Sequence, residues 1–555
     1  MEKTGLFMFK KILFTIFILI FCSISTAFAY DADTVIRVGI SNTSFSKYIF
    51  DDEQFYSDGE LVITDAATGE TATAAVGENI RVTMNDGLFR IYCGGLLKKT
   101  DLTGPLIIRP ASGHLIGVEN LKRAGKPAFY RGVIELVKSQ KKSNGYSIVN
   151  VLDLKNYLKG VVPNEMPVYF GLEALKAQCV AARNYALRPR DKFYKEFDIC
   201  DSVACQVYFG AKTEKPLSNQ AVDETDGLVA LYDNQLILAL YSSTAGGYTE
   251  SYSYAFSDPS SGRFPAKEIP YLQAKPDNPD TPDLQNEEAA RAFYTSKPET
   301  YDNNSSYFRW TREWTVDEFI KMLNKTMKEQ AGFVKPRFTD LDKFSHLKEI
   351  KIKERGHSGK VMFVEITTEN GLYTIGKELT LRRLFKKDGK ALPSANFVCD
   401  LYKDEVTGDM KVKFSGGGFG HGVGMSQFGA GKMSKTGKSF VEILQHYYSG
   451  ISIGTIPFTL TSSYRNNHIT QSFMAPDAKA KLVINDVRGV SDFSIIVNEK
   501  ETDIEIGKLF KKSKIDISNY LRKGMNTVEI IVPVDYTGQK MLNAHIEIKE
   551  ADYAQ

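Results

Sequence analysis

The sequence predicts an α+β fold with a mixed, β-rich core, a few helices and a C-terminal all-β domain of sandwich type. Residues 35–148 and 477–555 hold short runs of β-branched and aromatic residues that are separated by turn signals. Leu172–Leu187 is rich in alanine and has a wide apolar arc, which indicates a largely buried helix. Residues 416–431 hold eight glycines, so a loop is expected there rather than a regular element.

Length and charge limit the classes of protein that fit. A chain of 555 residues predicts two or three domains. The net charge of +3 is too small to suggest strong non-specific nucleic-acid binding, so we expect no nucleic-acid partner.

The first 29 residues have the pattern of a secretory signal peptide. Three lysines precede a short apolar segment, and an Ala-x-Ala site ends at Ala29, which makes Tyr30 the expected mature start. Cleavage would leave a secreted or cell-wall protein without a transmembrane segment. An uncleaved membrane anchor is the alternative.

The remaining chain divides by composition. The β-rich N-terminal part of the core is expected at 30–150, with one strand at Phe129–Leu136, and the rest of the core at 151–455. A stretch rich in Pro, Asp and Asn predicts an insertion or mobile loop around 274–306. Residues 456–476 are expected to form a linker and 477–555 a β-sandwich-like appendage, which is either carbohydrate-binding or structural.

Glu165 is the strongest candidate for acid–base chemistry. It lies in the segment VVPNEMP (161–167), which we predict to be a loop stiffened by Pro163 and Pro167. Apolar neighbours on both sides would desolvate its carboxyl and raise its pKa, as a general acid near neutral pH requires. A helix-capping or surface glutamate is the alternative.

The predicted helix Leu172–Leu187 also holds candidate residues. Gln178 falls in the apolar arc, where a buried amide needs partners, so it is either a structural bridge or a substrate contact. Arg183 lies on a narrow polar stripe of the same helix. Cys179 is expected to be an apolar filler.

Five cysteines would remain after cleavage, and two of them are close in sequence. Cys200 and Cys205 allow a disulfide, two thiols or part of a zinc site. Tetrahedral zinc needs more ligands than this pair, and no histidine is near in sequence.

Two loops rich in glycine and hydroxyl groups are candidates for the lining of one site. The first spans residues 241–250 and the second 416–431. The alternative for each loop is a surface turn without a functional role. We expect the second loop to bring main-chain amides close to a ligand. A hydrolase that uses Ser426 or Ser243 with His421 is a weak alternative, because no nucleophile-elbow context appears.

Five motifs in order resemble the stage II sporulation protein D and amidase-enhancer family. They are VVPNEMP (161–167), EALKAQCVAARNYAL (173–187), CDSVACQVYFG (200–210), YSSTAGGYTES (241–251) and GGGFGHGVGMSQFGAGKM (416–433). The resemblance covers roughly residues 35–455. It implies an exported lytic transglycosylase that acts on the glycan strands of peptidoglycan. The sporulation members of the family prefer glycan strands from which the stem peptides have been removed.

The resemblance also implies roles for particular residues. Glu165 stands at the position of the family's catalytic acid, and no second carboxylate is required. Relatives often have a zinc-ligating histidine where this chain has Ala204, so we expect no cofactor, with zinc doubtful. The family also contains non-catalytic wall-binding proteins that enhance a partner amidase. The expected glycan contacts are Gln178, Arg183, Tyr208, Ser242, Ser243, Gly246, Gly247, Gly418, Gly420, His421, Gly422, Gly424, Met425, Ser426 and Gln427.

Overall fold

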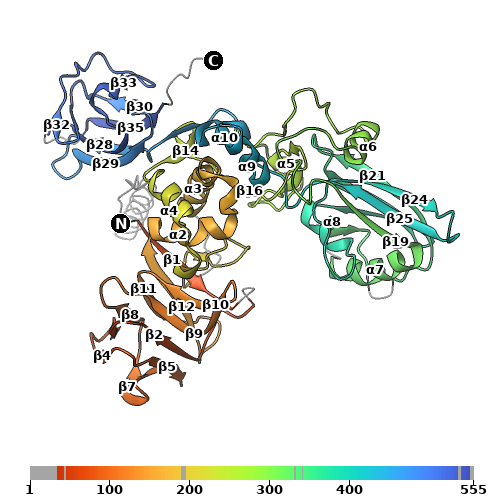
Figure 1. Cartoon of the computed structure of the whole chain (residues 1–555), viewed down its shortest axis with the longest axis horizontal. Helices are drawn as coiled ribbons and strands as arrows, with labels where there is room; N and C mark the ends of the chain where they lie inside the picture. The colour runs from red at the N-terminus through yellow and green to blue at the C-terminus, as the bar shows by residue number, and fades with distance from the viewer. Residues whose placement is uncertain are drawn as a thin grey trace, which may run out of the picture. The chain divides into compact units, whose positions relative to one another are not determined.

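The computed structural model describes residues 34–42, 46–188, 195–330, 333–339, 342–535 and 539–549 (Figure 1). The expected signal peptide lies outside these residues. Tertiary contacts divide the described chain into two compact units, residues 34–454 and 455–549. The predicted fold class is confirmed, because many small sheets accompany a few helices. Within the described residues, no helix is both long and apolar enough to span a bilayer.

The N-terminal part of the first unit consists of two sheets. The first has the order β13 (Ile199–Cys200), β1 (Val35–Ile40), β12 (Tyr146–Asp153), β11 (Val133–Lys138), β8 (Leu106–Pro110), β3 (Leu61–Asp65) and β4 (Thr71–Ala74). The second has the order β10 (Lys126–Tyr130), β9 (Ile116–Arg123), β2 (Asp52–Tyr56), β5 (Ile80–Asn85), β6 (Leu88–Cys93) and β7 (Leu96–Leu102). Both sheets bury alternate residues, as the period of a strand requires.

The single strand predicted at Phe129–Leu136 is wrong, because the chain changes sheet within it. Strand β10 ends at Tyr130 in one sheet, and β11 begins at Val133 in the other. Gly132 between them has φ +74°, and a Cβ atom there would collide with the carbonyl oxygen of Val151. Only glycine fits this turn.

A group of helices follows, with α3 (Leu172–Leu187) at its centre. This helix has the predicted bounds, and it contacts α2, α4, α9 and α10 because its apolar arc is wide. The other elements of the group are α2 (Leu154–Glu165), η1 (Val168–Phe170), η2 (Ala211–Thr213), α4 (Pro216–Asp223), α9 (Gln427–Lys435) and α10 (Phe440–Tyr447). Three short strands accompany them, β14 (Val229–Tyr232), β15 (Gln235–Leu236) and β27 (Ser452–Gly454).

The two glycine loops pair through very short strands. β16 (Tyr241–Ser242) lies parallel to β26 (Met425–Ser426), and β17 (Tyr248–Thr249) pairs with β18 (Lys275–Pro276). Helix α5 (Tyr252–Ala255) follows the first loop. The chain thus brings two segments almost two hundred residues apart in sequence side by side.

The stretch expected to form an insertion or mobile loop contains a regular helix. Residues 274–306 contain α6 (Glu287–Thr295), whose first turn is capped by the side chain of Asn286. Beyond it, one sheet contains β19 (Trp310–Thr315), β25 (Met410–Gly416) and β24 (Phe397–Lys403). Another contains β20 (Val334–Lys335), β23 (Gly371–Gly376), β22 (Val361–Thr368) and β21 (Leu347–Arg355). We call residues 274–416 the insertion module.

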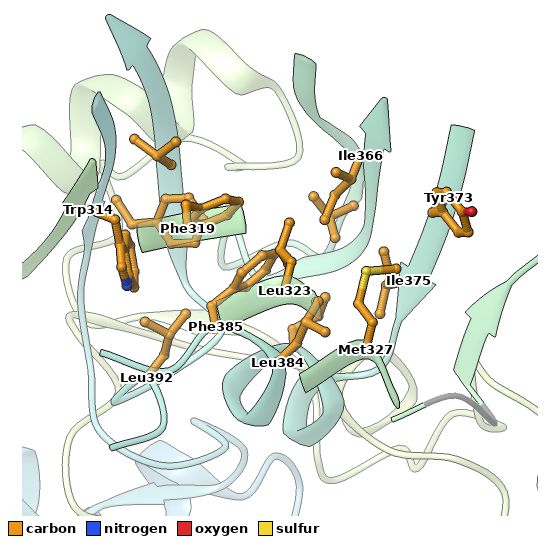
Figure 2. Packing of buried hydrophobic residues seen from close by; sticks show 14 of the residues in the cluster. Trp314, Phe319, Leu323, Met327, Ile366, Tyr373, Ile375, Leu384, Phe385 and Leu392 are labelled. Atoms are coloured by element: carbon orange, nitrogen blue, oxygen red, sulfur yellow. The ribbon is translucent and has the colours of Figure 1, made fainter. Parts of the chain in front are cut away.

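The insertion module has its own hydrophobic core, which α7 (Val316–Glu329) and α8 (Glu378–Leu384) share with the strands (Figure 2). Phe397 and Phe414 stack with ring centroids 4.5 Å apart. Phe385 packs against Phe414 and Phe319, at 5.0 and 5.7 Å between centroids. Aromatic pairs of this kind contribute beyond the area that they bury.

The C-terminal unit contains two antiparallel sheets. One contains β28 (Phe458–Thr461), β35 (Met541–Ile548), β30 (Ala480–Arg488) and β33 (Lys514–Asp516). The other contains β29 (His468–Ala475), β34 (Gly524–Ile531), β31 (Ser494–Val497) and β32 (Lys500–Glu501), and η4 (Ser518–Tyr520) precedes β34. Residues 456–476 are therefore not a linker. The polar residues that suggested one alternate with the buried side chains of β29, which pairs with β34 along its whole length.

Replacement of Phe385 by alanine tests the independence of the insertion core. Phe385 is fully buried, so we expect Phe385→Ala to lower the free energy of unfolding of the module by about 3–5 kcal/mol. Both tryptophans of the chain, Trp310 and Trp314, lie in this core, so their fluorescence in a denaturant titration follows this module. Leu379→Ala is the control, because Leu379 is 46% exposed on α8, the helix that ends just before Phe385. Equal midpoints for the two variants would contradict this packing.

Candidate active site

Glu165 is the last residue of helix α2, so the predicted loop for VVPNEMP is wrong. The helix begins at the cap of Asp153, whose carboxylate accepts from the Asn156 N–H at 2.8 Å. It continues through Pro163, which removes one backbone hydrogen bond of the helix, while the neighbouring residues Val161 and Val162 are buried in the fold. Met166 then takes an extended conformation because Pro167 follows it. The end of a packed helix, rather than a loop, therefore positions the carboxyl.

The carboxyl of Glu165 is partly buried and has one hydrogen bond. The main-chain N–H of Val207 donates to its Oε1 at 2.5 Å. Burial raises the pKa of Glu165 to about 7, while the Val207 bond opposes this shift by favouring the anion. Among the described residues, no hydrogen bond reaches Oε2 of Glu165. This geometry suits a carboxylic acid that is protonated near neutral pH and can exchange its proton with a substrate.

Gln427 joins three of the sequence motifs at this point. Its Nε2 donates to the carbonyl oxygen of Glu165 at 2.8 Å and lies 3.2 Å from Oε1 of Gln178. Gln178 is fully buried in α3 and accepts this bond, while its Nε2 has no hydrogen-bond partner among the described residues, so both a structural role and a substrate contact stay predictions. The PNEMP segment, helix α3 and the second glycine loop therefore meet around Glu165.

Gln206 fixes the position of its neighbour Val207. The hydroxyl of Tyr157 donates to Oε1 of Gln206 at 3.0 Å, and Nε2 of Gln206 donates to the hydroxyl oxygen of Tyr241 at 3.1 Å. Tyr157 belongs to α2 and Tyr241 to β16, so this one amide ties the cysteine loop to both elements. Because Gln206 is buried, these bonds restrict the backbone that presents the Val207 N–H.

A buried ion pair anchors the beginning of the cysteine loop. Asp201 accepts from the Ser41 N–H at 3.0 Å and from the Ser41 hydroxyl at 2.6 Å, and Arg123 donates to it at 2.5 Å. The side chains of Arg123 and Asp201 are both almost completely buried. The N-terminal sheets thus hold the loop that reaches Glu165.

Cys200 and Cys205 lie side by side as thiols within this loop. The hydrogen bond from Cys205, together with Ser202, lowers the pKa of the Cys200 thiol to about 6. No three His, Cys, Asp or Glu side chains lie close enough to hold a metal ion anywhere in the described chain. Since Ala204 supplies no ligand and tetrahedral zinc needs four, the residues present do not fit a zinc site.

The second glycine loop packs its backbone directly against the first. Gly418, Gly420, Gly422 and Gly424 all have positive φ, so alternate residues adopt conformations that favour glycine. A Cβ atom at Gly420 would come within 2.8 Å of the Cβ of Ser242. Thr244 and Phe419 exchange backbone hydrogen bonds across this contact at 2.8 and 3.2 Å.

We expected main-chain N–H groups of the glycine loops to face a ligand, but several of them donate to acceptors within the protein. The N–H groups of Gly418 and Gly420 donate to the carbonyl oxygens of Tyr307 and Pro393, at 2.8 and 3.0 Å. The N–H of Gly246 donates to the carboxyl of Asp302 at 2.8 Å. These glycines therefore shape the support of the site, and substrate contacts from Gly246, Gly247, Gly418, Gly420, Gly422 and Gly424 stay predictions.

The insertion module holds the glycine loops through buried polar groups. Glu250, at the end of the first loop, accepts from the N–H and the hydroxyl of Ser358, at 3.1 and 2.7 Å. Lys360 is fully buried and donates to Asn396 at 2.5 Å. Burial and then the nearby charge of Lys360 lower the pKa of His421 to about 3, so this imidazole is neutral and accepts from the Val423 N–H at 3.1 Å.

Several other predicted contact residues lie inside the fold. Arg183 is fully buried and donates to the carbonyl oxygen of Leu228 at 2.8 Å. Tyr208 is buried against Tyr157 and donates to Asn150 at 2.6 Å. Met425 is fully buried. Their direct contact with a substrate remains a prediction.

Ser426 and Ser243 take part in internal hydrogen bonds. The Ser426 hydroxyl donates to Asp302 at 3.1 Å and accepts from the Gly429 N–H at 3.3 Å as the cap of α9. The carbonyl oxygen of Ser243 accepts from the Phe428 N–H at 3.0 Å. Ser242 is buried beside Gly420. In the described part of the chain, neither Ser243 nor Ser426 is hydrogen-bonded to His421, which leaves the serine-hydrolase alternative without a nucleophile–base pair.

Sequence reasoning missed three groups at the site. The Val207 N–H and the Gln206 amide lie in a motif that had been noticed only for its cysteines. Asp302, whose pKa burial raises to about 7, comes from a polar stretch that indicated an exposed loop. Gln206 and Tyr241 are far apart in sequence, so their contact could not be predicted from local patterns.

Comparison with known proteins supports a relationship in this region. The sequence model of a family described as "Stage II sporulation protein" matches residues 142–232, and that of a domain of unknown function (DUF8618) matches residues 260–424. The second match contains the whole insertion module.

Two curated relatives illustrate the relationship. An amidase enhancer of Bacillus subtilis (strain 168) is 32% identical over 302 residues, which are 53% of this chain and 40% of that protein. A stage II sporulation protein D of Bacillus amyloliquefaciens is 30% identical over 333 residues, which are 56% of this chain and 77% of that protein. The chain therefore spans well under half of the first relative and about three quarters of the second.

The buried ion pair predicts a large loss of stability when one partner is removed. Arg123→Met leaves the Asp201 carboxylate buried without its counter-ion, so we expect the free energy of unfolding to fall by about 3–5 kcal/mol. Chemical denaturation followed by far-UV circular dichroism measures it. The control is Lys142→Met, because Lys142 pairs with Asp51 where both side chains are half exposed, and such pairs contribute about 0–1 kcal/mol. A loss no larger than the control's would contradict the anchoring role.

Proposed function

The chain belongs to the stage II sporulation protein D family, and on this premise we propose that it is an exported peptidoglycan lytic transglycosylase. Its substrate is the glycan strand, preferentially one without stem peptides, and the bond cleaved joins N-acetylmuramic acid to N-acetylglucosamine. The observation that carries the proposal is the carboxyl of Glu165, which is partly buried, has a raised pKa and meets three family motifs.

The reaction needs one group that acts first as an acid and then as a base. Protonated Glu165 gives its proton to the glycosidic oxygen while the bond from that oxygen to C1 of the muramic acid breaks. The glucosamine leaves with a hydroxyl group. The Glu165 carboxylate then takes the proton of the muramic acid C6 hydroxyl, whose oxygen bonds to C1 and closes a 1,6-anhydro ring. Glu165 regains its proton and no water is consumed.

The surroundings of Glu165 match these two tasks. Burial keeps the group protonated near pH 7, so it can act as an acid. The Val207 N–H stabilises the carboxylate that forms after proton transfer, and it does so at Oε1, which leaves Oε2 for the sugar oxygens. A paired-acid hydrolase would need a second carboxylate and a water between the two.

Replacement of Glu165 by glutamine tests the assignment. Glu165→Gln keeps the shape but cannot exchange a proton, so we expect release of anhydro-disaccharides from peptide-stripped sacculi to fall by roughly 10²–10⁴-fold. Mass spectrometry of the products measures it, since an anhydro end is lighter by one water than a hydrolysed end. Glu119→Gln, on an exposed position of β9, is the matched control.

The same experiment has contradicting outcomes. Full activity in Glu165→Gln would remove Glu165 from the chemistry. Products with an ordinary reducing end would show hydrolysis instead of transglycosylation.

The raised pKa predicts the pH dependence. The acid form of Glu165 is the active one, so cleavage should fall about tenfold per unit as pH rises above about 7. Initial rates on peptide-stripped sacculi, measured from about pH 4 to about pH 9, give this dependence. A decline that already begins near pH 4.5, the ordinary pKa of a glutamate, would show that burial does not raise the pKa of Glu165.

A second candidate function is enhancement of a partner cell-wall amidase without catalysis. The relative named amidase enhancer supports it. The two functions differ in the role of Glu165: an enhancer binds sacculi, releases no glycan products, and stimulates an added amidase equally well as wild type and as Glu165→Gln.

A further inference from the structure

The two cysteines beside the active site share one tight turn. The Cys200 N–H donates to Sγ of Cys205 at 3.3 Å, and the Cys205 N–H donates to the carbonyl oxygen of Ser202 at 2.9 Å. The turn therefore folds the second sulfur back onto the backbone of the first cysteine. The Cys205 side chain is also hydrogen-bonded to that of Cys200, so the two sulfur atoms are close to each other, as a disulfide requires.

The turn lies between the anchor and the group that it positions. Asp201, next to Cys200, is fixed by the buried pair with Arg123. Gln206 and Val207 follow Cys205 directly, and Val207 donates to the Glu165 carboxyl. The four residues from Ser202 to Cys205 are thus the segment through which the anchor holds the Val207 amide.

We propose that Cys200 and Cys205 form a reversible disulfide that holds the Val207 amide against Glu165. A covalent bond across the turn adds to the backbone bonds that already close this segment, from the Cys205 N–H to the Ser202 carbonyl oxygen and from the Tyr208 N–H to the Asp201 carbonyl oxygen, and so limits the motion of Val207 between them. The alternative use of such a pair, metal binding, lacks further ligands among the described residues.

The turn is open to a small oxidant. Val203 is 88% exposed, and Cys205 is less buried than Cys200. The Cys205 thiolate attacks a small-molecule disulfide and releases one thiol, which gives a mixed disulfide. The Cys200 thiolate then attacks the Cys205 sulfur and displaces the second thiol. The two protons of the cysteine thiols end on the two thiols released, and the oxidant gains both electrons.

Formation of the disulfide does not depend on the proposed function, whereas the effect of the disulfide on glycan cleavage rests on the proposed function. Three separate readouts on the whole protein keep the two apart: the covalent state of the pair, the hydrogen exchange of the Val207 amide, and the pH profile of glycan cleavage.

The first readout uses a single tryptic peptide. Cleavage after Lys195 and Lys212 gives residues 196–212, which contain Cys200 and Cys205 and no other cysteine. After equilibration with oxidised and reduced glutathione, this peptide should be lighter by two hydrogens and resist alkylation, and dithiothreitol should restore two alkylation sites. A peptide that keeps two thiols at every glutathione ratio, or that holds zinc against oxidation, overturns the proposal.

The second and third readouts test the link to Glu165. In the oxidised protein the Val207 amide should exchange about tenfold more slowly than in the reduced protein, because its hydrogen bond opens less often. The descending limb of the cleavage profile should lie about one pH unit lower in the oxidised protein, because the Val207 bond favours the carboxylate.

Matched variants complete the test. Cys200→Ser and Cys205→Ser should exchange like the reduced wild type under both conditions, whereas Cys93→Ser should respond like the wild type. Equal exchange at Val207 in both redox states would overturn the link even if the disulfide forms. Absence of glycan cleavage in both states would refute the proposed function, and the peptide mass and the Val207 exchange would still decide the disulfide and its link to Glu165.

Discussion

The hydrogen bond from the Val207 main chain to the Glu165 carboxyl is the constraint on which the site depends. Glu165 ends a helix and Val207 follows the cysteine loop, so this bond sets where the carboxyl lies between two separate segments. A main-chain donor cannot change its charge and moves little when its neighbours are fixed. Here the neighbours are fixed by Gln206, Tyr157 and Tyr241. The acid therefore has a defined position without a charged partner that would hold its pKa low.

The support behind this bond extends over much of the first unit. The N-terminal sheets contribute Ser41 and Arg123 to the buried anchor of Asp201. The insertion module contributes Ser358, which binds Glu250 at the end of the first glycine loop. The alternate glycines of the second loop let the two loops lie backbone against backbone, with Gln427 following directly and reaching Glu165. A small catalytic centre thus rests on parts of the chain that hold no catalytic group themselves.

The periodicity of apolar residues predicted helix α3 correctly, but it did not predict the elements whose form depends on tertiary packing. The helix Leu172–Leu187 was found to its ends, because its apolar arc and its alanines act locally. The prolines around Glu165 suggested a loop, yet α2 continues through Pro163 because Val161 and Val162 are buried in the fold, and such burial outweighs a local preference. Gly132 divides a run that looks like one strand because the chain must change sheet there, which is a tertiary demand. Residues 456–476 looked like a linker, since β29 buries only alternate residues.

The site shows the same division. Glu165, Gln178 and Gln427 were identified from their motifs, and they meet in the structure. Val207 and Asp302 were not identified, because a backbone donor has no sequence signal and an aspartate in a polar stretch indicates a surface. The polar stripe that contains Arg183 is largely buried as well, and the guanidinium donates to a carbonyl oxygen on a neighbouring segment that periodicity alone does not identify.

The central claim is that burial keeps the Glu165 carboxyl protonated near neutral pH. Infrared difference spectra between wild type and Glu165→Gln isolate the carbonyl band of this one acid, and a pH titration of the band gives its pKa directly. The account predicts a midpoint of about 7. A midpoint near 4.5, the value for an ordinary glutamate, would contradict it.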